Sequence, residues 1–237
     1  MKWKPAIVLA ALSVALSFVG SMPATAASDK APDSFHASGL TASAEFMLPD
    51  GGRGVVQIID GVQTSRTPGS KPVQEAIPAG LAAMGVPGPY ADPTVLAREL
   101  WCLTYDKTAI SISSDLTGAW ADFTCEGLFI DVVCTAWEGE ECAGAEEILN
   151  EDLSDTITVS ATWEGVGGLT RTISIGKSFG PDWWLSHTRA TQRMAMASGS
   201  IRGLETTYFE GTFDSAELAA MKDISLQRTP AEPEPEP

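Results

Sequence analysis

Histidine is scarce in this chain, and its scarcity narrows the chemistry that the chain could carry out. Two histidines, His36 and His187, occur among 237 residues. Nucleophilic catalysis by a Ser/His/Asp set requires a histidine base or a substitute for it. His187 directly follows Ser186, but adjacent residues on a strand point to opposite faces, and the sequence contains no Gly-x-Ser-x-Gly elbow. We therefore assign no catalytic residue and expect a protein that is not an enzyme.

Basic residues are also few. The chain has 15 Lys and Arg residues against 31 Asp and Glu residues, for a formal net charge of −16. A chain with this charge repels the phosphate backbone of nucleic acids. We expect no nucleic-acid partner, and the acidity itself is typical of a protein that is kept in solution outside the cell.

Long apolar runs are missing after the N-terminus. The one such run, Ala6 to Val19, follows Lys2 and Lys4 and precedes Pro23-Ala24-Thr25-Ala26. A basic start, a short apolar stretch and a small-x-small end are typical of a secretory signal peptide, whereas a membrane-spanning helix needs about 20 apolar residues. We expect residues 1–26 to be a signal peptide, cleaved after Ala26 or Ala27. The mature protein is then secreted and extracellular, without membrane insertion.

The cysteines lack metal-ligand spacing. Cys102, Cys125, Cys134 and Cys142 contain no Cys-x-x-Cys pair, and neither histidine lies within a few residues of them. We therefore expect no metal centre and no cofactor. In an exported protein, an even number of cysteines predicts disulfides. Of the three possible pairings we favour Cys102 with Cys125 and Cys134 with Cys142, because the second pair closes a short loop.

Acidic residues gather in the segment 138–155, which contains no base. Carboxylates are the ligands that calcium prefers, but the Asp-x-[Asp/Asn]-x-[Asp/Asn]-Gly pattern of a calcium loop is missing. We interpret the segment as a solvated acidic loop and keep a calcium site as the alternative.

Apolar and polar residues alternate along most of the chain, as in half-buried strands. Residues 39–48 and 55–59 predict a hairpin around Pro49-Asp50-Gly51-Gly52, and residues 157–163 and 171–177 predict another around residues 164–168. The run 128–134 is apolar on both faces apart from Asp131, which is typical of a central strand. A short helix competes with a strand over residues 80–84, 94–100 and 216–222.

About ten strands with few helical periods predict an all-β fold, an antiparallel β-sandwich of immunoglobulin-like or jelly-roll-like type with at most one or two short helices. We expect a disordered lead over residues 27–37 and a single domain over residues 38–229. The Pro/Glu-rich residues 230–237 cannot bury apolar area and predict a disordered tail.

One phrase of the sequence carries a resemblance. The stretch Ser160-Ala-Thr-Trp-Glu-Gly-Val-Gly-Gly-Leu-Thr-Arg171, an aromatic loop after it, and Ala197-Ser-Gly-Ser200 resemble a pattern in secreted bacterial hypothetical proteins of β-sandwich type. The resemblance covers about a fifth of the chain. It implies a fold and a compartment, and no functional residue.

Tryptophan offers the best candidates for a binding site. Trp120, Trp137 and Trp163 fall in predicted strands, where we expect them to fill the core. Trp183 and Trp184 follow Gly180-Pro181-Asp182 in a predicted loop, where two adjacent rings are difficult to bury together. We therefore take Trp183 and Trp184 as ligand-binding candidates for a glycan or an extracellular protein, neither of which the sequence identifies. An extracellular hydrolase that uses paired acidic residues is the remaining alternative.

Overall fold

The computed structural model describes residues 34–48, 51–66, 69–86, 88–138, 141–177 and 184–227. The strands are β1 (Ser34–Met47), β2 (Arg53–Arg66), β3 (Val73–Glu75), β4 (Gly80–Val86), β5 (Val95–Thr104), β6 (Ile110–Ile112), β7 (Gly118–Glu126), β8 (Leu128–Glu138), β9 (Glu141–Leu149), β10 (Thr156–Gly165), β11 (Thr170–Lys177), β12 (Trp184–Arg202), β13 (Thr207–Thr212) and β14 (Ser215–Gln227). Helical structure in this part of the chain is limited to the 3-10 turn η2 (Lys107–Ala109). No helix in the described residues is long and apolar enough to cross a membrane.

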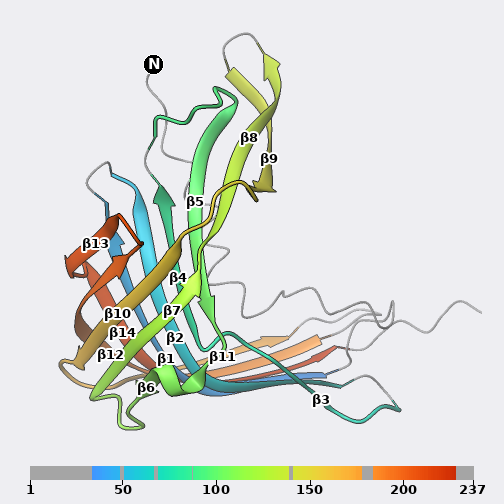
Figure 1. The fold of residues 1–237 in the computed structure, drawn as a ribbon. Coiled ribbons are helices and arrows are strands. Elements are labelled where there is room, and N and C mark those ends of the chain that lie inside the picture. The colour runs from blue at the N-terminus through green and yellow to red at the C-terminus, as the bar shows by residue number, and fades with distance from the viewer. Residues whose placement is uncertain are drawn as a thin grey trace, which may run out of the picture.

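All of these strands belong to one antiparallel sheet (Figure 1). Its strand order is β6-β7-β10-β12-β14-β1-β2-β4-β5-β8-β9, with β11 and β13 paired to β12 and β3 paired to β2. β6 and β9 end this order without pairing to each other, so the sheet is open. The all-β, antiparallel fold predicted from the alternating pattern is confirmed.

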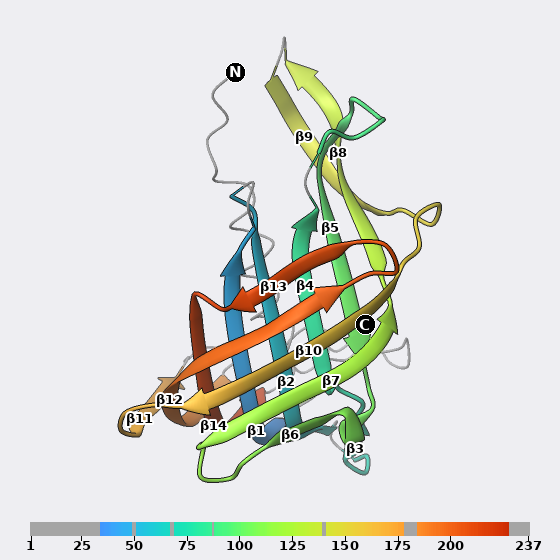
Figure 2. The ribbon, with the colours of Figure 1, turned by 60° about the vertical axis from the view of Figure 1, so that its left-hand side comes forward.

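The sheet folds over itself into two layers because several stretches of chain pass from one layer to the other (Figure 2). β7 continues into β8 across Gly127, and β13 continues into β14 across residues 213–214. β12 pairs with β10 and β13 through its second half and with β11 and β14 through its first half. Strands that bend from one sheet into another are how orthogonally packed sheets form their corners. One layer therefore holds β6, β7, β10, β13 and part of β12, and the other holds β14, β1, β2, β4, β5 and β8.

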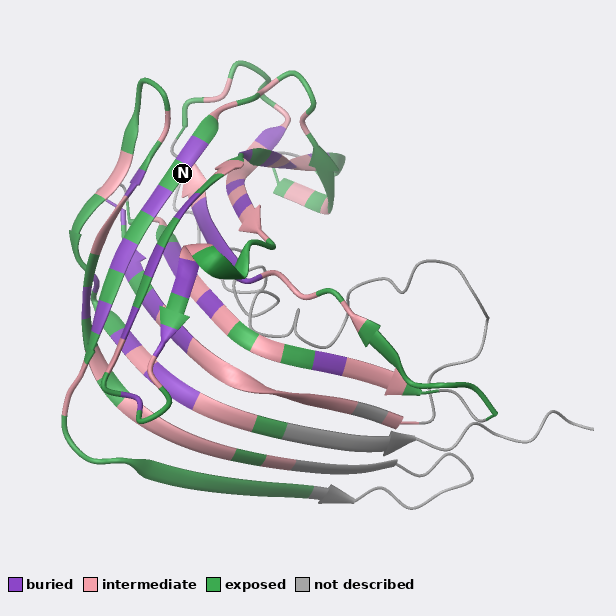
Figure 3. Cartoon of the chain, turned by 60° about the horizontal axis from the view of Figure 1, so that its bottom comes forward, coloured by how far each residue is buried: buried purple, intermediate pink, exposed green. Residues whose placement is uncertain are grey.

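The core lies between the two layers. Trp163 of β10 is 3% exposed, and its indole N–H donates to the backbone carbonyl of Ser43 in β1 at 3.0 Å, which ties one layer to the other. Figure 3 shows the buried positions concentrated where the layers overlap. The largest fully buried side chains come from both layers and include Phe46, Ile58, Met84, Leu100, Ile157, Val159, Ile201 and Leu218.

Two disulfides are present, and both join the pairs that the sequence favours. Cys102 of β5 and Cys125 of β7 connect the two layers, with 5.7 Å between their Cα atoms. Cys134 and Cys142 connect β8 to β9, with 5.8 Å between their Cα atoms. The first disulfide therefore holds the layers together, and the second closes the β8–β9 hairpin, which we call the arm.

Six strands extend beyond the core in the order β11-β12-β14-β1-β2-β3, and we call this extension the shelf (Figure 1). Gly39 of β1 pairs with Gly61 of β2. A Cβ atom on Gly39 would lie 2.5 Å from the Cα of Gly61. The two strands thus approach each other at this pair more closely than a side chain would allow.

The segments in which a helix competes with a strand are all strands. Residues 80–84 lie in β4, residues 95–100 in β5, and residues 216–222 in β14. Their alternate side chains, such as Met84 and Leu218, are buried between the layers. Burial in the sheet therefore overrides the local helix propensity of Ala, Leu and Met.

The predicted hairpin over residues 157–177 is wrong. β10 pairs with β7 and β12, whereas β11 pairs with β12, so β10 and β11 follow one another along the same partner strand. The backbone N–H of Val166 donates to the carbonyl of Met194 in β12 at 2.8 Å, within the interruption between the two strands. Residues 166–169 are thus an irregularity in one long strand and not a reversal of the chain.

The run 128–134 is not the central strand that its apolar pattern predicts. It lies in β8, beside the end strand β9. Phe129 is 7% exposed, but its neighbour Leu128 on the other face is 41% exposed. At the other boundaries, β1 begins at Ser34, inside the predicted lead, while residues 1–26 and 230–237 lie outside the described residues.

Gly127 gives a test of the corner between β7 and β8. A Cβ atom there would lie 2.7 Å from Cδ1 of Leu100 and 3.0 Å from Cγ1 of Ile157. We expect Gly127→Val to lower the free energy of unfolding by about 1 to 3 kcal/mol through overpacking, measured by urea denaturation. Gly168→Ala, where no atom lies within 4 Å, is the matched control. Equal stability of the two variants would contradict the close packing at this corner.

Candidate functional site

The three strand tryptophans do not share one environment, contrary to the sequence-based expectation. Trp163 is buried as predicted, but Trp120 is 43% exposed and Trp137 is 48% exposed. Trp137 lies on the arm, and Trp120 lies on β7 between β6 and β10. The prediction that all three fill the core is therefore wrong for Trp120 and Trp137.

The local alternation of β7 contains the signal that would have placed Trp120 outside. Ala119, Ala121 and Phe123 are buried, while Asp122 and Thr124 are exposed. Trp120 has the same parity as Asp122 and Thr124, so the strand period alone sets its ring on the solvent face. At this position the alternation of the strand outweighs the usual burial of tryptophan.

The tryptophan pair proposed from sequence can be placed only in part. Trp183 lies outside the described residues. Trp184 is the first residue of β12, and its backbone is in register with Gln227 of β14 at the outer end of the shelf. Trp184 is therefore 14 residues along β12 from Ser198, which shares a row with Trp120 across the intervening strand β10.

Trp120 belongs to a solvent face that is otherwise dominated by hydroxyl groups, which we call the hydroxyl face. The strand register puts Ser111, Trp120, Thr162, Ser198 and Thr212 in one row across β6, β7, β10, β12 and β13. The hydroxyl residues of the face are Ser111, Thr124, Thr158, Ser160, Thr162, Ser198, Ser200 and Thr212, and all but the half-buried Ser200 are exposed.

Hydrogen bonds between neighbouring strands fix several side chains of the hydroxyl face. The Thr124 and Thr158 hydroxyls lie 3.2 Å apart, and the Thr162 and Ser198 hydroxyls lie 3.4 Å apart. Beneath Trp120, Ala121 and Phe123 anchor β7 in the core. The indole and the hydroxyl rows are thus held on rigid strands, as a preorganised binding surface requires.

The acidic segment after Glu138 is part of the arm and not a loop. Residues 141–149 form β9, and Glu141, Glu146 and Glu147 on this strand are exposed. The described residues contain no group of three or more His, Cys, Asp or Glu side chains that could hold a metal ion. The strand conformation spreads successive acidic side chains over two faces, which works against their convergence on one calcium ion.

A buried ion pair supports the base of the arm. Arg98 of β5 donates to both carboxylate oxygens of Asp131 in β8, with 2.8 Å between Nη2 and Oδ2, and Asn150 donates to the same Oδ2 at 2.8 Å. The Arg98 guanidinium holds the pKa of Asp131 below its usual value despite burial, and Asn150 adds to this effect. Burial raises the pKa of the nearby Glu99, against a hydrogen bond from Trp101 that lowers it.

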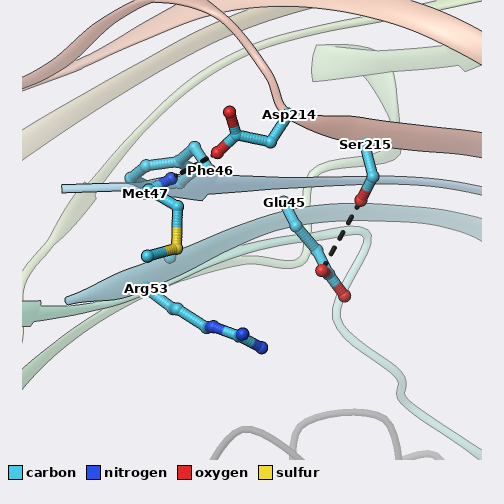
Figure 4. Close-up of a pocket in the computed structure, with 7 residues that line it drawn as sticks. Glu45, Phe46, Met47, Arg53, Asp214 and Ser215 are labelled. Atoms are coloured by element: carbon cyan, nitrogen blue, oxygen red, sulfur yellow. Dashed lines mark hydrogen bonds between the residues drawn. The ribbon is translucent and has the colours of Figure 1, made fainter. Parts of the chain in front are cut away.

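A small pocket of about 210 Å³ lies beside the β1–β2 hairpin, lined by Glu45, Phe46, Met47, Arg53, Gly54, Asp214 and Ser215. Figure 4 shows its two carboxylates directed at different partners. Asp214 accepts from the backbone N–H of Met47 at 2.7 Å, and Glu45 accepts from the Ser215 hydroxyl at 3.5 Å. Both carboxylates hold the chain in place and do not face each other across the pocket, so this arrangement gives no support to glycoside hydrolysis.

The two histidines lie on shelf strands, at positions that pair with the same residue of β14. His36 of β1 and His187 of β12 both pair with Ile224 of β14, from opposite sides. Ser186 occupies the preceding position on β12, in register with Ser225. Successive positions alternate between the faces of a strand, so Ser186 and His187 do not form a nucleophile and base pair through their position on the strand.

Comparison with known proteins adds no family to these observations. Neither the protein-family models nor the curated proteins nor the solved structures that were searched match this chain.

The Arg98–Asp131 pair gives a stability test that depends on pH. The pKa of Asp131 is lowered in the folded state. Its ionised carboxylate therefore contributes fully to the free energy of unfolding above its unfolded pKa of 3.8. That contribution is lost as the pH falls through the lower pKa of the folded state. We expect Asp131→Asn to lose about 1 to 3 kcal/mol of unfolding free energy near neutral pH, because the half-buried Arg98 loses its ionic partner. The loss should shrink well below pH 3.8, measured by urea denaturation. The exposed Asp122→Asn serves as control, and a loss that is equal at both pH values would contradict the assignment.

Proposed function

We propose that the protein is an extracellular or cell-envelope binding module that takes glycan chains on the hydroxyl face, with Trp120 as the stacking platform. The observation that carries this proposal is the large indole exposed among rows of Ser and Thr side chains on rigid strands. The two disulfides are compatible with an oxidising, extracellular compartment.

The chemistry of the face suits a sugar polymer. A Trp ring offers a large apolar area and a polar N–H, which matches the mixed apolar and hydroxyl surface of a sugar ring. Ser and Thr hydroxyls both donate and accept, so they can pair with sugar hydroxyls in either sense. Five strands spaced about 4.8 Å apart make a surface about 20 Å wide, enough for a chain of several sugars to lie across it.

The charges of the face restrict the type of glycan. Asp122 and Glu164 are exposed on it, and Arg202 is engaged with Glu210 at 2.8 Å. A polyanionic chain would meet these carboxylates and the negative charge of the whole protein. We therefore propose a neutral glycan as the ligand of the hydroxyl face. Trp183 and Trp184, the pair proposed from the sequence, are a second candidate platform.

A protein-binding role for the arm is the second proposal. The arm exposes Trp137, Ile148 and Leu149 beside the end strand β9, whose outer backbone groups have no described strand next to them. Exposed apolar side chains beside an unpaired strand edge are the features that partner proteins use for strand addition.

Substitution of the two exposed tryptophans separates these proposals. We expect Trp120→Ala to weaken binding to neutral polysaccharides about tenfold, because the stacking contact is lost. The measurement is affinity electrophoresis in gels that contain soluble glucans, mannans or xylans. Trp137→Ala is the matched control, since its ring is similarly exposed on another part of the molecule. Binding that is lost in Trp137→Ala and kept in Trp120→Ala would reject the hydroxyl face as the glycan site.

A further inference from the structure

One face of the shelf concentrates basic residues in a chain whose net charge is −16. The alternation of the paired strands puts a set of arginines and one lysine on the same face as the buried residues Ala42, Ile58 and Leu218 of the core. We call it the basic face, and its described exposed basic side chains are Arg66, Arg171, Arg189 and Lys222. Among the described residues of this face, Asp60 is acidic, and its Oδ1 lies 3.8 Å from Nζ of Lys107.

The basic side chains of this face are close neighbours. Lys222 of β14 is directly opposite Arg189 of β12, and Arg171 of β11 is diagonal to Arg189. Directly opposite residues have Cβ atoms about 5 Å apart, and diagonal ones about 7 to 8 Å. These spacings place three positively charged side chains within reach of one anionic group. An anion bound across Lys222, Arg189 and Arg171 would be attracted by all three.

Exposed aliphatic side chains share the face with these charges. Ile173 is 64% exposed and Ile175 is 59% exposed, and Ile173 is directly opposite Arg189. Val62 of β2, in register with Ser38, is 41% exposed on the same face. The basic face therefore combines cationic groups with apolar side chains that would gain from leaving water.

We propose that the basic face docks on the surface of an anionic phospholipid membrane, with Arg171, Arg189 and Lys222 against headgroup phosphates and Ile173 and Ile175 in the interface. A soluble polyanion would satisfy the charges but leave the isoleucines in water. A phospholipid surface satisfies both, since basic residues are attracted to anionic headgroups and apolar side chains enter the boundary with the acyl chains. In this arrangement the basic face lies against the membrane surface.

The distribution of charge in the whole molecule favours this orientation. The acidic arm, with Glu138, Glu141, Glu146 and Glu147, projects at the opposite end of the molecule from the shelf (Figures 1 and 2). Charges are screened beyond about 8 Å at physiological ionic strength. An anionic surface next to the basic face would thus attract the shelf while the repulsion from the arm is screened.

Vesicle co-sedimentation of the purified protein tests the proposal. We expect binding to vesicles of phosphatidylcholine mixed with phosphatidylglycerol, at least tenfold weaker binding to phosphatidylcholine alone, and loss of binding at high salt. Arg171→Gln and Lys222→Gln should each weaken binding several-fold, and Ile173→Ser with Ile175→Ser should weaken it while keeping the salt dependence. The matched control is Arg53→Gln, which removes one exposed charge beside the β1–β2 turn and should bind as the unchanged protein does.

Further measurements make each result decisive. The melting temperature of Lys222→Gln should be close to that of the unchanged protein, because the Lys222 side chain is exposed, so loss of binding cannot be attributed to unfolding. Equal binding to neutral and anionic vesicles, an equal loss in Arg53→Gln, or binding to dextran sulfate without binding to vesicles would each overturn the proposal. Trp120→Ala should bind vesicles normally, so a failure of membrane docking is distinguishable from a failure of glycan binding.

Discussion

In the described part of the chain no helix covers the sheet, so the sheet buries its apolar face against another part of itself, and this constraint shapes the fold. The described strands meet it by passing from one layer to the other at Gly127, at residues 213–214 and along β12. Trp163 and the Cys102–Cys125 disulfide then tie the layers across the core. Because orthogonal layers overlap only where they cross, the strands continue beyond the core on both sides, as the shelf and the arm.

Because of these extensions, surfaces of different chemistry lie on different parts of the molecule. The hydroxyl face lies on the outside of one layer, the basic face lies on the shelf, and the acidic residues of β9 lie on the arm at the far end. Charge separation of this kind orients a protein toward a charged surface even when its net charge has the same sign as that surface. Glycan binding and membrane docking would therefore use different faces and can operate in the same molecule.

Predictions that depend on residues close together in the sequence were correct more often than those that depend on distant strands. The β1–β2 hairpin and the Cys134–Cys142 pair were predictable because turn residues and a short loop act locally. The pairing of β10 and β11 was not, because the glycines at 165, 167 and 168 permit either a turn or an irregular strand. Trp120 was misplaced because its size was weighed above its strand parity, although the parity was present in the sequence.

The sequence by itself determined the all-β class, the alternation of apolar and polar residues and the acidic character, since these depend on composition and on local pattern, and it favoured the cysteine pairing without fixing it. Only the tertiary structure decided that both layers belong to one sheet and that β8 lies beside the end strand. It also brought Arg171, Arg189 and Lys222 to one face. These features depend on which strands pair across long sequence separations, and strand pairing follows from how the whole sheet covers its core.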